Sequence, residues 1–271
     1  MKGKKRLVLV LALALVLALG SVGIGYAITY GQPDGNNHPY VAMIVFDAEI
    51  EGTVQPACRC SGTLISDTVV LTAGHCTDGA EAARVWFEPT INDGHYPYGG
   101  GTAIETASVH TDPDFCIGCA PGLPGFDTHD VGIVVLSREV TDKSYGVLPS
   151  ENLVDTLKMN TEVTLVGYGG QEQTRGIPPH QWTGRDRYYA PANLVQSKDV
   201  LSDDFIKVSG NPAQGKGGTC FGDSGGPTFL EDTSTILAVT SFGSNGNCAG
   251  VSYNNRVDTA AELEFINSFL D

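Results

Sequence analysis

Residues 220–227 read CFGDSGGP, which sets Ser224 between glycines and directly after Asp223. Glycine allows tight turns in which neighbouring backbone N–H groups point at one developing oxyanion. If only Gly-Xaa-Ser-Gly were present, an ordinary glycine-rich turn would be the default interpretation. The complete octapeptide is far more specific for a nucleophilic serine. We therefore interpret Ser224 as a catalytic nucleophile.

The same stretch also fits the Gly-Xaa-Ser-Xaa-Gly nucleophile elbow of α/β-hydrolases. That elbow needs a helix after the serine, whereas Pro227-Thr228-Phe229-Leu230 is a poor helix start. It also needs a catalytic histidine after the serine. All six histidines precede Ser224, namely His38, His75, His95, His110, His129 and His180. These two observations exclude the elbow.

A nucleophilic serine needs a general base, and the upstream sequence offers His75. The apolar run Val69–Leu71 predicts a strand, and Thr72-Ala73-Gly74-His75-Cys76 follows it directly. Cys60 lies sixteen residues before Cys76 and could staple this loop. A histidine fixed in this way just after a strand is held rigidly enough for proton transfer.

The base in turn needs an orienting carboxylate, and Asp130 is the candidate. It directly precedes the apolar run Val131–Leu136, so it lies at the mouth of a predicted buried strand, where an acid requires a partner. Asp127 is a nearby alternative, but it lies in the loop before that strand. His129 has no flanking motif, and we interpret it as a surface loop histidine.

The sequence pattern of the chain is typical of an all-β protein, because short apolar runs alternate with turn residues. The chain has 34 glycines and 14 prolines. The runs are Tyr40–Phe46, Val69–Leu71, Arg84–Phe87, Val131–Leu136, Val163–Tyr168, Phe205–Val208 and Ile236–Thr240. Many short strands of this kind predict a sandwich or a barrel. Residues 171–193 read as a long surface loop. One helix is predicted at 259–270, where Thr259 and Glu262 fit a capping box.

The first 27 residues have the layout of a secretory signal peptide. A basic head, Lys2–Arg6, precedes the apolar run Leu7–Leu19, and the small residues Gly25 and Ala27 suit cleavage after Ala27. An uncleaved anchor is the alternative, because residues 7–27 carry no charge and are long enough to span a bilayer. The glycines weaken the apolar run, so we expect cleavage and a secreted, extracellular protein without stable membrane association.

The net charge of the chain argues against one class of partner. The 271 residues carry a formal net charge of −15, and loss of the four basic residues of the leader lowers it to −19. So acidic a chain repels phosphate backbones, and no basic stripe offsets the charge, which argues against a nucleic-acid partner. We expect no cofactor.

Seven cysteines agree with export, because thiols pair in an oxidising compartment and an odd count leaves one over. Spacing alone does not fix their connectivity. A zinc site is the alternative for Cys58-Arg59-Cys60 and for Cys116-Ile117-Gly118-Cys119. The first spacing is wrong for a zinc knuckle, and no closely spaced histidine pair accompanies the second, so we expect no metal.

The three motifs together resemble the chymotrypsin (trypsin-like) serine protease family, whose order along the chain is His75, Asp130, Ser224. The resemblance covers essentially all of residues 28–271. It implies an all-β fold of two six-stranded antiparallel barrels, about 28–148 and 149–258, with a C-terminal helix at 259–270. The active site would lie in the cleft between the barrels.

The resemblance also implies a role for each residue. Ser224 would attack the scissile carbonyl of a protein or peptide substrate, His75 would take and return the proton, and Asp130 would fix the tautomer of His75. The backbone N–H groups of Gly222 and Ser224 would bind the oxyanion. A catalytically inactive protease-like binding module is the alternative, but this chain keeps the whole triad.

Members of the family are activated when a new Ile or Val N-terminus pairs with the acid before the nucleophile, here Asp223. Signal cleavage after Ala27 would expose Ile28, and no spacer separates the two residues. Gly31 and Pro39-Tyr40-Val41 match the family pattern that follows. We expect export itself to free the activating amine.

The pocket for the residue before the cleaved bond is expected to involve Gly218, Thr219, Ser241, Phe242 and Gly243. By resemblance Gly218 floors this pocket, where an aspartate would select Arg or Lys. The stretch Ser241-Phe242-Gly243 matches the strand that lines the pocket. Without a buried acid the pocket gives a cation no partner, so we expect apolar or aromatic residues there.

The resemblance implies the disulfides Cys60–Cys76 and Cys220–Cys248. A local bridge Cys116–Cys119 would leave Cys58 free, although that bridge departs from any family pattern. We expect a monomer.

Overall fold

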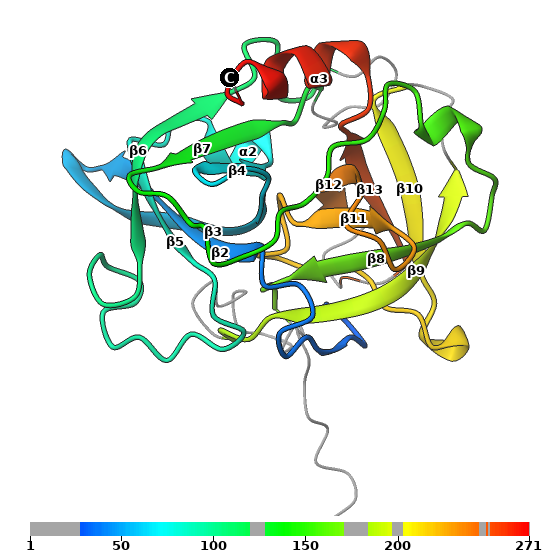
Figure 1. The fold of residues 1–271 in the computed structure, drawn as a ribbon, viewed down its shortest axis with the longest axis horizontal. Coiled ribbons are helices and arrows are strands. Elements are labelled where there is room, and N and C mark those ends of the chain that lie inside the picture. Colours follow the sequence, from blue (N-terminus) through cyan, green and yellow to red (C-terminus); the bar gives the residue numbers. More distant parts are fainter. Residues whose placement is uncertain are drawn as a thin grey trace, which may run out of the picture.

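The computed structural model describes residues 28–119, 128–170, 184–196, 203–243, 248 and 250–270. The predicted signal peptide at 1–27 and the alternative acid Asp127 lie outside the described residues. Two antiparallel barrels lie side by side, one built from the blue to green part of the chain and the other from the green to red part (Figure 1).

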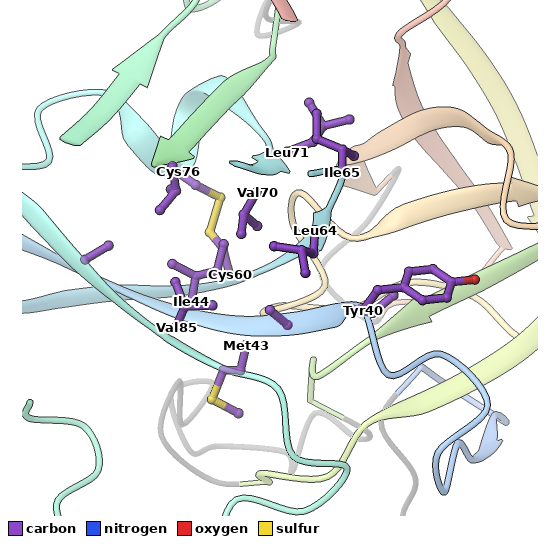
Figure 2. Packing of buried hydrophobic residues seen from close by; sticks show 14 of the residues in the cluster. Tyr40, Met43, Ile44, Cys60, Leu64, Ile65, Val70, Leu71, Cys76 and Val85 are labelled. Carbon is purple, nitrogen blue, oxygen red and sulfur yellow. A yellow bond between two sulfur atoms is a disulfide. The ribbon is translucent and has the colours of Figure 1, made fainter. Parts of the chain in front are cut away.

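The first barrel is closed and has six strands in the order β2-β3-β4-β7-β6-β5. Its strands are β2 (Val41–Ile50), β3 (Thr53–Leu64), β4 (Val69–Thr72), β5 (Ala82–Trp86), β6 (Ile104–Thr111) and β7 (Gly132–Leu136). In register, Val41 lies opposite Thr63 and Val69 lies opposite Val135. Apolar side chains fill the interior, and the Cys60–Cys76 disulfide lies within this core (Figure 2).

The second barrel has the strand order β8-β9-β10-β13-β12-β11, and it closes because β8 pairs with both β9 and β11. Its strands are β8 (Glu162–Gly167), β9 (Tyr188–Gln196), β10 (Phe205–Gly210), β11 (Pro227–Leu230), β12 (Ile236–Gly243) and β13 (Gly250–Arg256). The short β1 (Gln32–Pro33) adds to the edge of β9. A separate apolar cluster that includes Ile28 fills this barrel. The predicted pair of six-stranded barrels is confirmed.

The C-terminal helix α3 spans Ala260–Asn267, a shorter segment than the expected 259–270. Thr259 is its N-cap, and the Thr259 side chain accepts a hydrogen bond from the Glu262 N–H at 3.4 Å. The helix returns to the first barrel: its buried residue Ile266 joins that core, and the ring of Phe269 lies 4.7 Å from that of His110 on β6. The chain end thereby covers β6 and β7 (Figure 1).

The surface loop expected at 171–193 is wrong at its C-terminal end, where Tyr188–Gln196 forms β9. Every second residue of this strand faces the second core, namely Tyr188, Ala190, Ala192 and Leu194. Two of these are alanines, so the alternation of hydrophobicity is faint in the sequence. Residues 171–183 lie outside the described residues.

Candidate active site

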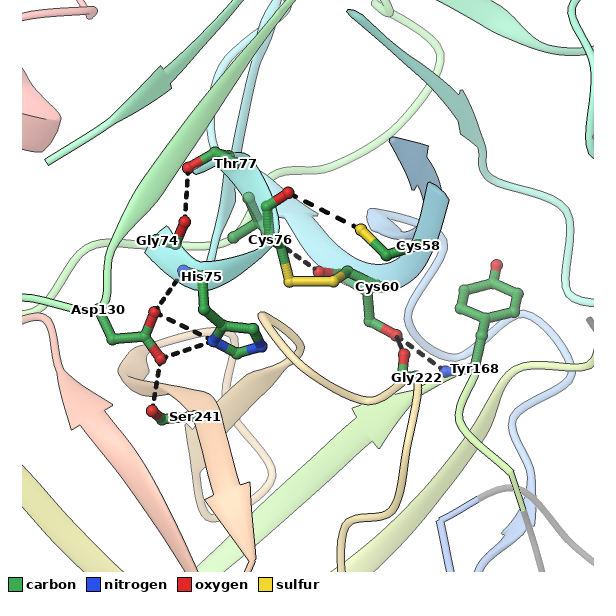
Figure 3. The surroundings of a disulfide bond; sticks show 12 residues. Cys58, Cys60, Gly74, His75, Cys76, Thr77, Asp130, Tyr168, Gly222 and Ser241 are labelled. Carbon is green, nitrogen blue, oxygen red and sulfur yellow. Dashed lines mark hydrogen bonds and ion pairs between the residues drawn. A yellow bond between two sulfur atoms is a disulfide. The ribbon is translucent and has the colours of Figure 1, made fainter. Parts of the chain in front are cut away.

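His75 lies on the short helix α2 (Gly74–Thr77), which directly follows β4. Cys76, the next residue, is joined to Cys60 on β3 by a disulfide. The Thr77 hydroxyl donates to the Gly74 carbonyl oxygen at 3.0 Å and closes the turn (Figure 3). The imidazole is therefore held on a fixed backbone, with 29% of its side chain exposed.

The carboxylate of Asp130 contacts both the backbone N–H and the imidazole of His75 (Figure 3). Its Oδ1 accepts the backbone N–H of His75 at 2.7 Å, and its Oδ2 lies 2.8 Å from the imidazole Nδ1. This contact uses Nδ1 and does not involve Nε2, the other ring nitrogen. The pairing holds Nδ1 as the protonated nitrogen of the ring.

Asp130 is completely buried just before β7 and is supported from the second barrel. The Ser241 hydroxyl on β12 donates to its carboxylate, and the Asn255 Oδ1 on β13 accepts the Asp130 N–H at 3.1 Å. Burial raises the pKa of the Asp130 carboxyl, but the charge of His75 and the hydrogen bonds from His75 and Ser241 outweigh burial. The pKa of Asp130 therefore lies below its ordinary value, and the carboxylate stays ionised.

Ser224 and His75 line the same pocket, which has a volume of about 420 Å³. The lining residues are His75, Thr219, Cys220, Phe221, Ser224, Thr240, Ser241, Phe242, Gly243 and Cys248. His75 comes from the first barrel and Ser224 from the second, so the pocket joins the two barrels. Ser224 is half-buried in the turn that precedes β11.

The turn that carries Ser224 is tied to the first barrel through Ser61 on β3. The Ser61 hydroxyl donates to the Gly222 carbonyl oxygen at 2.9 Å and accepts the Tyr168 N–H at 3.0 Å. The Ser61 N–H donates to the Ser224 carbonyl oxygen at 2.8 Å. Gly222 has φ of +97°, a conformation that glycine adopts without strain. These contacts fix the backbone around the two N–H groups expected to bind an oxyanion.

Asp223 is buried beneath this turn. Its Oδ1 accepts the Gly169 N–H at 2.7 Å, and its Oδ2 accepts the Cys220 N–H at 2.9 Å. Burial raises the pKa of the Asp223 carboxyl to about 7, although these two hydrogen bonds and the charge of Arg59 lower it. Ile28 is also fully buried, but its N–H makes no hydrogen bond to Asp223. Within the described ranges, no ion pair neutralises this acid.

Four of the five residues expected around the specificity pocket line the pocket that contains His75 and Ser224. Thr219, Ser241, Phe242 and Gly243 line the pocket, whereas Gly218 does not. Gly218 instead pairs with Thr29, whose carbonyl oxygen accepts the Gly218 N–H at 3.1 Å. The ring of Phe242 stacks on Tyr253 with 4.8 Å between centroids, which fixes the aromatic wall.

The structure joins Cys60 to Cys76, Cys220 to Cys248 and Cys116 to Cys119, and Cys58 is free. Burial raises the pKa of the Cys58 thiol to about 11, which keeps it protonated. Cys60, His75 and Cys76 bring potential metal-binding atoms within 4.8 Å of one another. Both sulfurs are bonded to each other, so neither is a thiolate ligand and the group does not fit a zinc site.

Three supporting contacts were missed by sequence reasoning. Ser61 contacts Gly222 across 161 positions, and Asn255 contacts Asp130 across 125. Glu262 contacts His129, the residue before Asp130, across 133 positions, and no local pattern marks any of these pairs. His129, expected on the surface, instead contacts Glu262 of α3: its Nδ1 lies 3.0 Å from Oε1. His129 is less exposed than expected because the C-terminal helix lies against it.

No helix in the part of the chain that the structure describes combines the length and the apolar character needed to cross a membrane.

Comparison with known proteins gives one consistent result. Residues 30–263 match the trypsin family. Collagenase of Hypoderma lineatum is 26% identical over 219 residues, which are 77% of this chain and 76% of that protein. Serine protease 1 of Drosophila melanogaster is 28% identical over 210 residues, 70% of this chain and 67% of that protein.

The solved structure of HL collagenase agrees in fold. It superposes with a TM-score of 0.66 at 21% identity and covers 90% of this chain and 97% of that one. The family match extends over both barrels and the first half of α3. The chain therefore belongs to the trypsin family, and it is a serine endopeptidase.

Proposed function

We propose that His75, Asp130 and Ser224 form the catalytic triad of this endopeptidase. The observation that carries the proposal is that Asp130 binds both the backbone N–H and the imidazole of His75, while His75 and Ser224 line one pocket. In the reaction, Ser224 Oγ attacks the substrate carbonyl carbon while His75 Nε2 removes the hydroxyl proton. His75 then returns that proton to the departing amine, and water repeats the cycle on the acyl-enzyme.

The backbone N–H groups of Gly222 and Ser224 bind the oxyanion that forms on the substrate carbonyl. Support comes from the positive φ of Gly222 and from the Ser61 contacts, which hold both residues of the turn. Donors fixed in advance need no reorganisation as charge develops, which makes them worth more than flexible donors.

A covalent label tests the nucleophile. We expect a serine-directed phosphonylating reagent to inactivate the purified protein and to leave its adduct on Ser224 in peptide mapping. The Ser224→Ala variant should take no label at the site and should lose about 10⁴- to 10⁶-fold in turnover. A catalytically inactive binding module would remain unlabelled, and an adduct on another serine would refute this assignment.

Activation follows from the first residues of the mature chain. Residues 1–27 act as a signal peptide that is cleaved after Ala27, and residues 28–271 form the secreted protease domain. The freed ammonium of Ile28 pairs with Asp223. The proposal is supported by the burial of both residues and by the raised pKa of Asp223, which a cation would lower.

The first residue of the secreted protein decides this activation route. Edman degradation or mass spectrometry should read Ile28 as the N-terminus of the active enzyme. A matched chain that keeps one extra residue before Ile28 should have much lower activity, since its amine is peptide-bonded. An active enzyme with any other first residue would exclude the route.

The substrate is a protein or peptide, and the pocket prefers an apolar or aromatic residue before the cleaved bond. Phe242 and the small residues Gly243 and Thr219 support this preference, because none of them offers a charge to a basic side chain. Chromogenic peptides that differ only at this residue test it: Phe and Leu should be cleaved faster than Arg. The opposite order would overturn the preference.

A monomer suffices for this activity, because all three side chains of the proposed triad come from one chain, and we propose that the enzyme acts as one. Sedimentation analysis of the active protein checks this state.

A further inference from the structure

The residue before Asp130 adopts an unusual backbone conformation. His129 has φ of +51°, in the left-handed region that residues other than glycine rarely occupy. Such a conformation persists only when surrounding contacts determine it. The described contact of the side chain is with Glu262 of α3, whose Oε1 lies 3.0 Å from His129 Nδ1.

The backbone of His129 also forms the turn that aims Asp130. The His129 carbonyl oxygen accepts the Val131 N–H at 2.7 Å, which closes a three-residue turn with Asp130 at its centre. The direction of the Asp130 side chain therefore depends on the conformation of His129. The Asn255 side chain holds the opposite side of the turn through the Asp130 N–H at 3.1 Å.

Glu262 has few other partners. It is 1% exposed, its Oε2 has no hydrogen-bond partner among the described residues, and its N–H is used by the Thr259 cap. Burial raises the pKa of Glu262, and the charges of Asp204 and Asp112 raise it further, whereas the charge of His129 lowers it. A buried carboxyl in this acidic setting is best satisfied by the imidazole that faces it.

We propose that His129 and Glu262 are a positioning pair: α3 holds His129 in its left-handed conformation and thereby aims Asp130 at His75. The inference rests on the proposed triad. Neither residue touches substrate, and both act through Asp130. Since the contact joins the end of the chain to the first barrel, the pair makes α3 part of the active-site support.

Steady-state kinetics on the mature enzyme test the pair. Glu262→Ala and His129→Ala should each lower kcat by about 10- to 100-fold, the loss expected when a catalytic group is displaced by about 1 Å. KM should change less than twofold, because the substrate pocket is untouched. Glu262→Gln keeps an oxygen that accepts from Nδ1 and should retain most of kcat. The kcat values are expressed per active site titrated with the phosphonylating reagent.

A matched control removes a similar contact elsewhere. His95→Ala deletes a histidine whose Nδ1 lies 3.1 Å from Asp93 in an exposed loop, and it should leave kcat unchanged. If a variant at His129 folds poorly, the comparison of Glu262→Gln with Glu262→Ala still decides the question.

The possible outcomes separate the two proposals. Unchanged kcat in Glu262→Ala with an active parent enzyme would overturn the positioning role, and so would equal losses in the Gln and Ala variants. The variants could instead have fewer active sites that react with the phosphonylating reagent but an unchanged kcat per site. That result would show a merely structural role for the pair and would also overturn the positioning role. An inactive, unlabelled parent enzyme would instead refute the proposed triad.

Discussion

At the scale of single residues, Ser61 links the two halves of the proposed active site. It is fully buried on β3, yet its hydroxyl and its N–H both bond to the turn that carries Ser224. The Thr72 hydroxyl donates to its carbonyl oxygen at 2.8 Å and fixes Ser61 itself. Ser61 of the first barrel therefore holds the geometry of the proposed oxyanion loop in the second.

Replacement of Ser61 by alanine should lower kcat by roughly tenfold, because the Gly222 carbonyl loses its anchor and the loop is less well aligned. The measurement is kcat and KM with one chromogenic peptide. Ser66→Ala is the control, since among the described residues the donors to the Ser66 hydroxyl are the Thr68 and Val69 N–H groups of its own turn. Equal losses in both variants would argue against this role of Ser61.

Asp223 predicts a pH dependence of stability. While the Ile28 amine is blocked, burial raises the pKa of Asp223 from 3.8 to about 7, so the folded state keeps a proton that the unfolded state has lost. The free energy of unfolding should therefore decrease with rising pH between about 4 and 7, by about 1.4 kcal/mol per pH unit from this group.

Urea unfolding across this pH range, on a chain with one extra residue before Ile28, measures that slope. Asp223→Asn should remove the contribution, and a free Ile28 amine should reduce it by stabilising the carboxylate. Identical slopes in all three proteins would contradict the assigned environment of Asp223.

At the scale of elements, the segment after β8 is shaped around the buried acid. A Cβ on Gly169 would collide with the Asp223 carboxylate, whereas a Cβ on the next residue, Gly170, would meet its nearest atom, the Phe221 carbonyl oxygen, at 3.7 Å. The space around Gly169 therefore excludes a larger residue, whereas the space around Gly170 does not.

Gly169→Ala should therefore destabilise the fold by about 1–3 kcal/mol through overpacking. It should also lower kcat/KM, since the Asp223 carboxylate anchors the proposed oxyanion turn. Gly170→Ala should change neither quantity much. Thermal unfolding and peptide hydrolysis of the two variants give the comparison. Greater damage from Gly170→Ala would contradict the described packing.

Apolar runs in the sequence predicted seven of the twelve barrel strands and an all-β fold. The pair of six-stranded barrels was implied by the resemblance to the chymotrypsin family. No apolar run predicted β3, β6, β9, β11 or β13. The buried face of β9 includes two alanines, and β13 carries polar residues at buried positions. On β13, for example, Asn254 and Asn255 are fully buried, and Asn255 is satisfied by the Asp130 N–H and the Arg256 carbonyl. The Asp130 N–H comes from another element, and no local pattern reveals such a partner.

In the candidate site, too, residues within local motifs could be predicted, whereas contacts between distant elements could not. His75, Asp130 and Ser224 stand in local motifs, so their neighbourhood could be predicted from the order of those motifs. The contact of His129 with Glu262 could not, because it depends on where α3 lies after the second barrel has closed.

At the scale of the whole molecule, a buried cation connects the barrels. Arg187, just before β9, donates to Asp34 through Nε at 2.7 Å and to the Val41 and Phe87 carbonyl oxygens of the first barrel through Nη1. It also lies 3.1 Å from the Tyr168 hydroxyl. The arrangement fixes the relative position of the barrels and hence of His75 and Ser224.

Arg187→Met should cost about 3–5 kcal/mol of stability, because the buried Asp34 carboxylate would lose the guanidinium and, among the described residues, keep only His38 as a partner. Lys143→Ala is the control: its partner Asp142 is exposed, so the loss should be below about 1 kcal/mol. Urea unfolding of both variants checks the difference. A loss no greater for Arg187→Met than for the control would contradict the bridging role.

The most direct test of the triad is the turnover number of three variants measured side by side: His75→Ala, Ser224→Ala and the double variant. Groups that act as one unit predict a double variant no slower than either single variant, each reduced by about 10⁴- to 10⁶-fold. Losses that multiply in the double variant would contradict a shared proton-transfer step between His75 and Ser224.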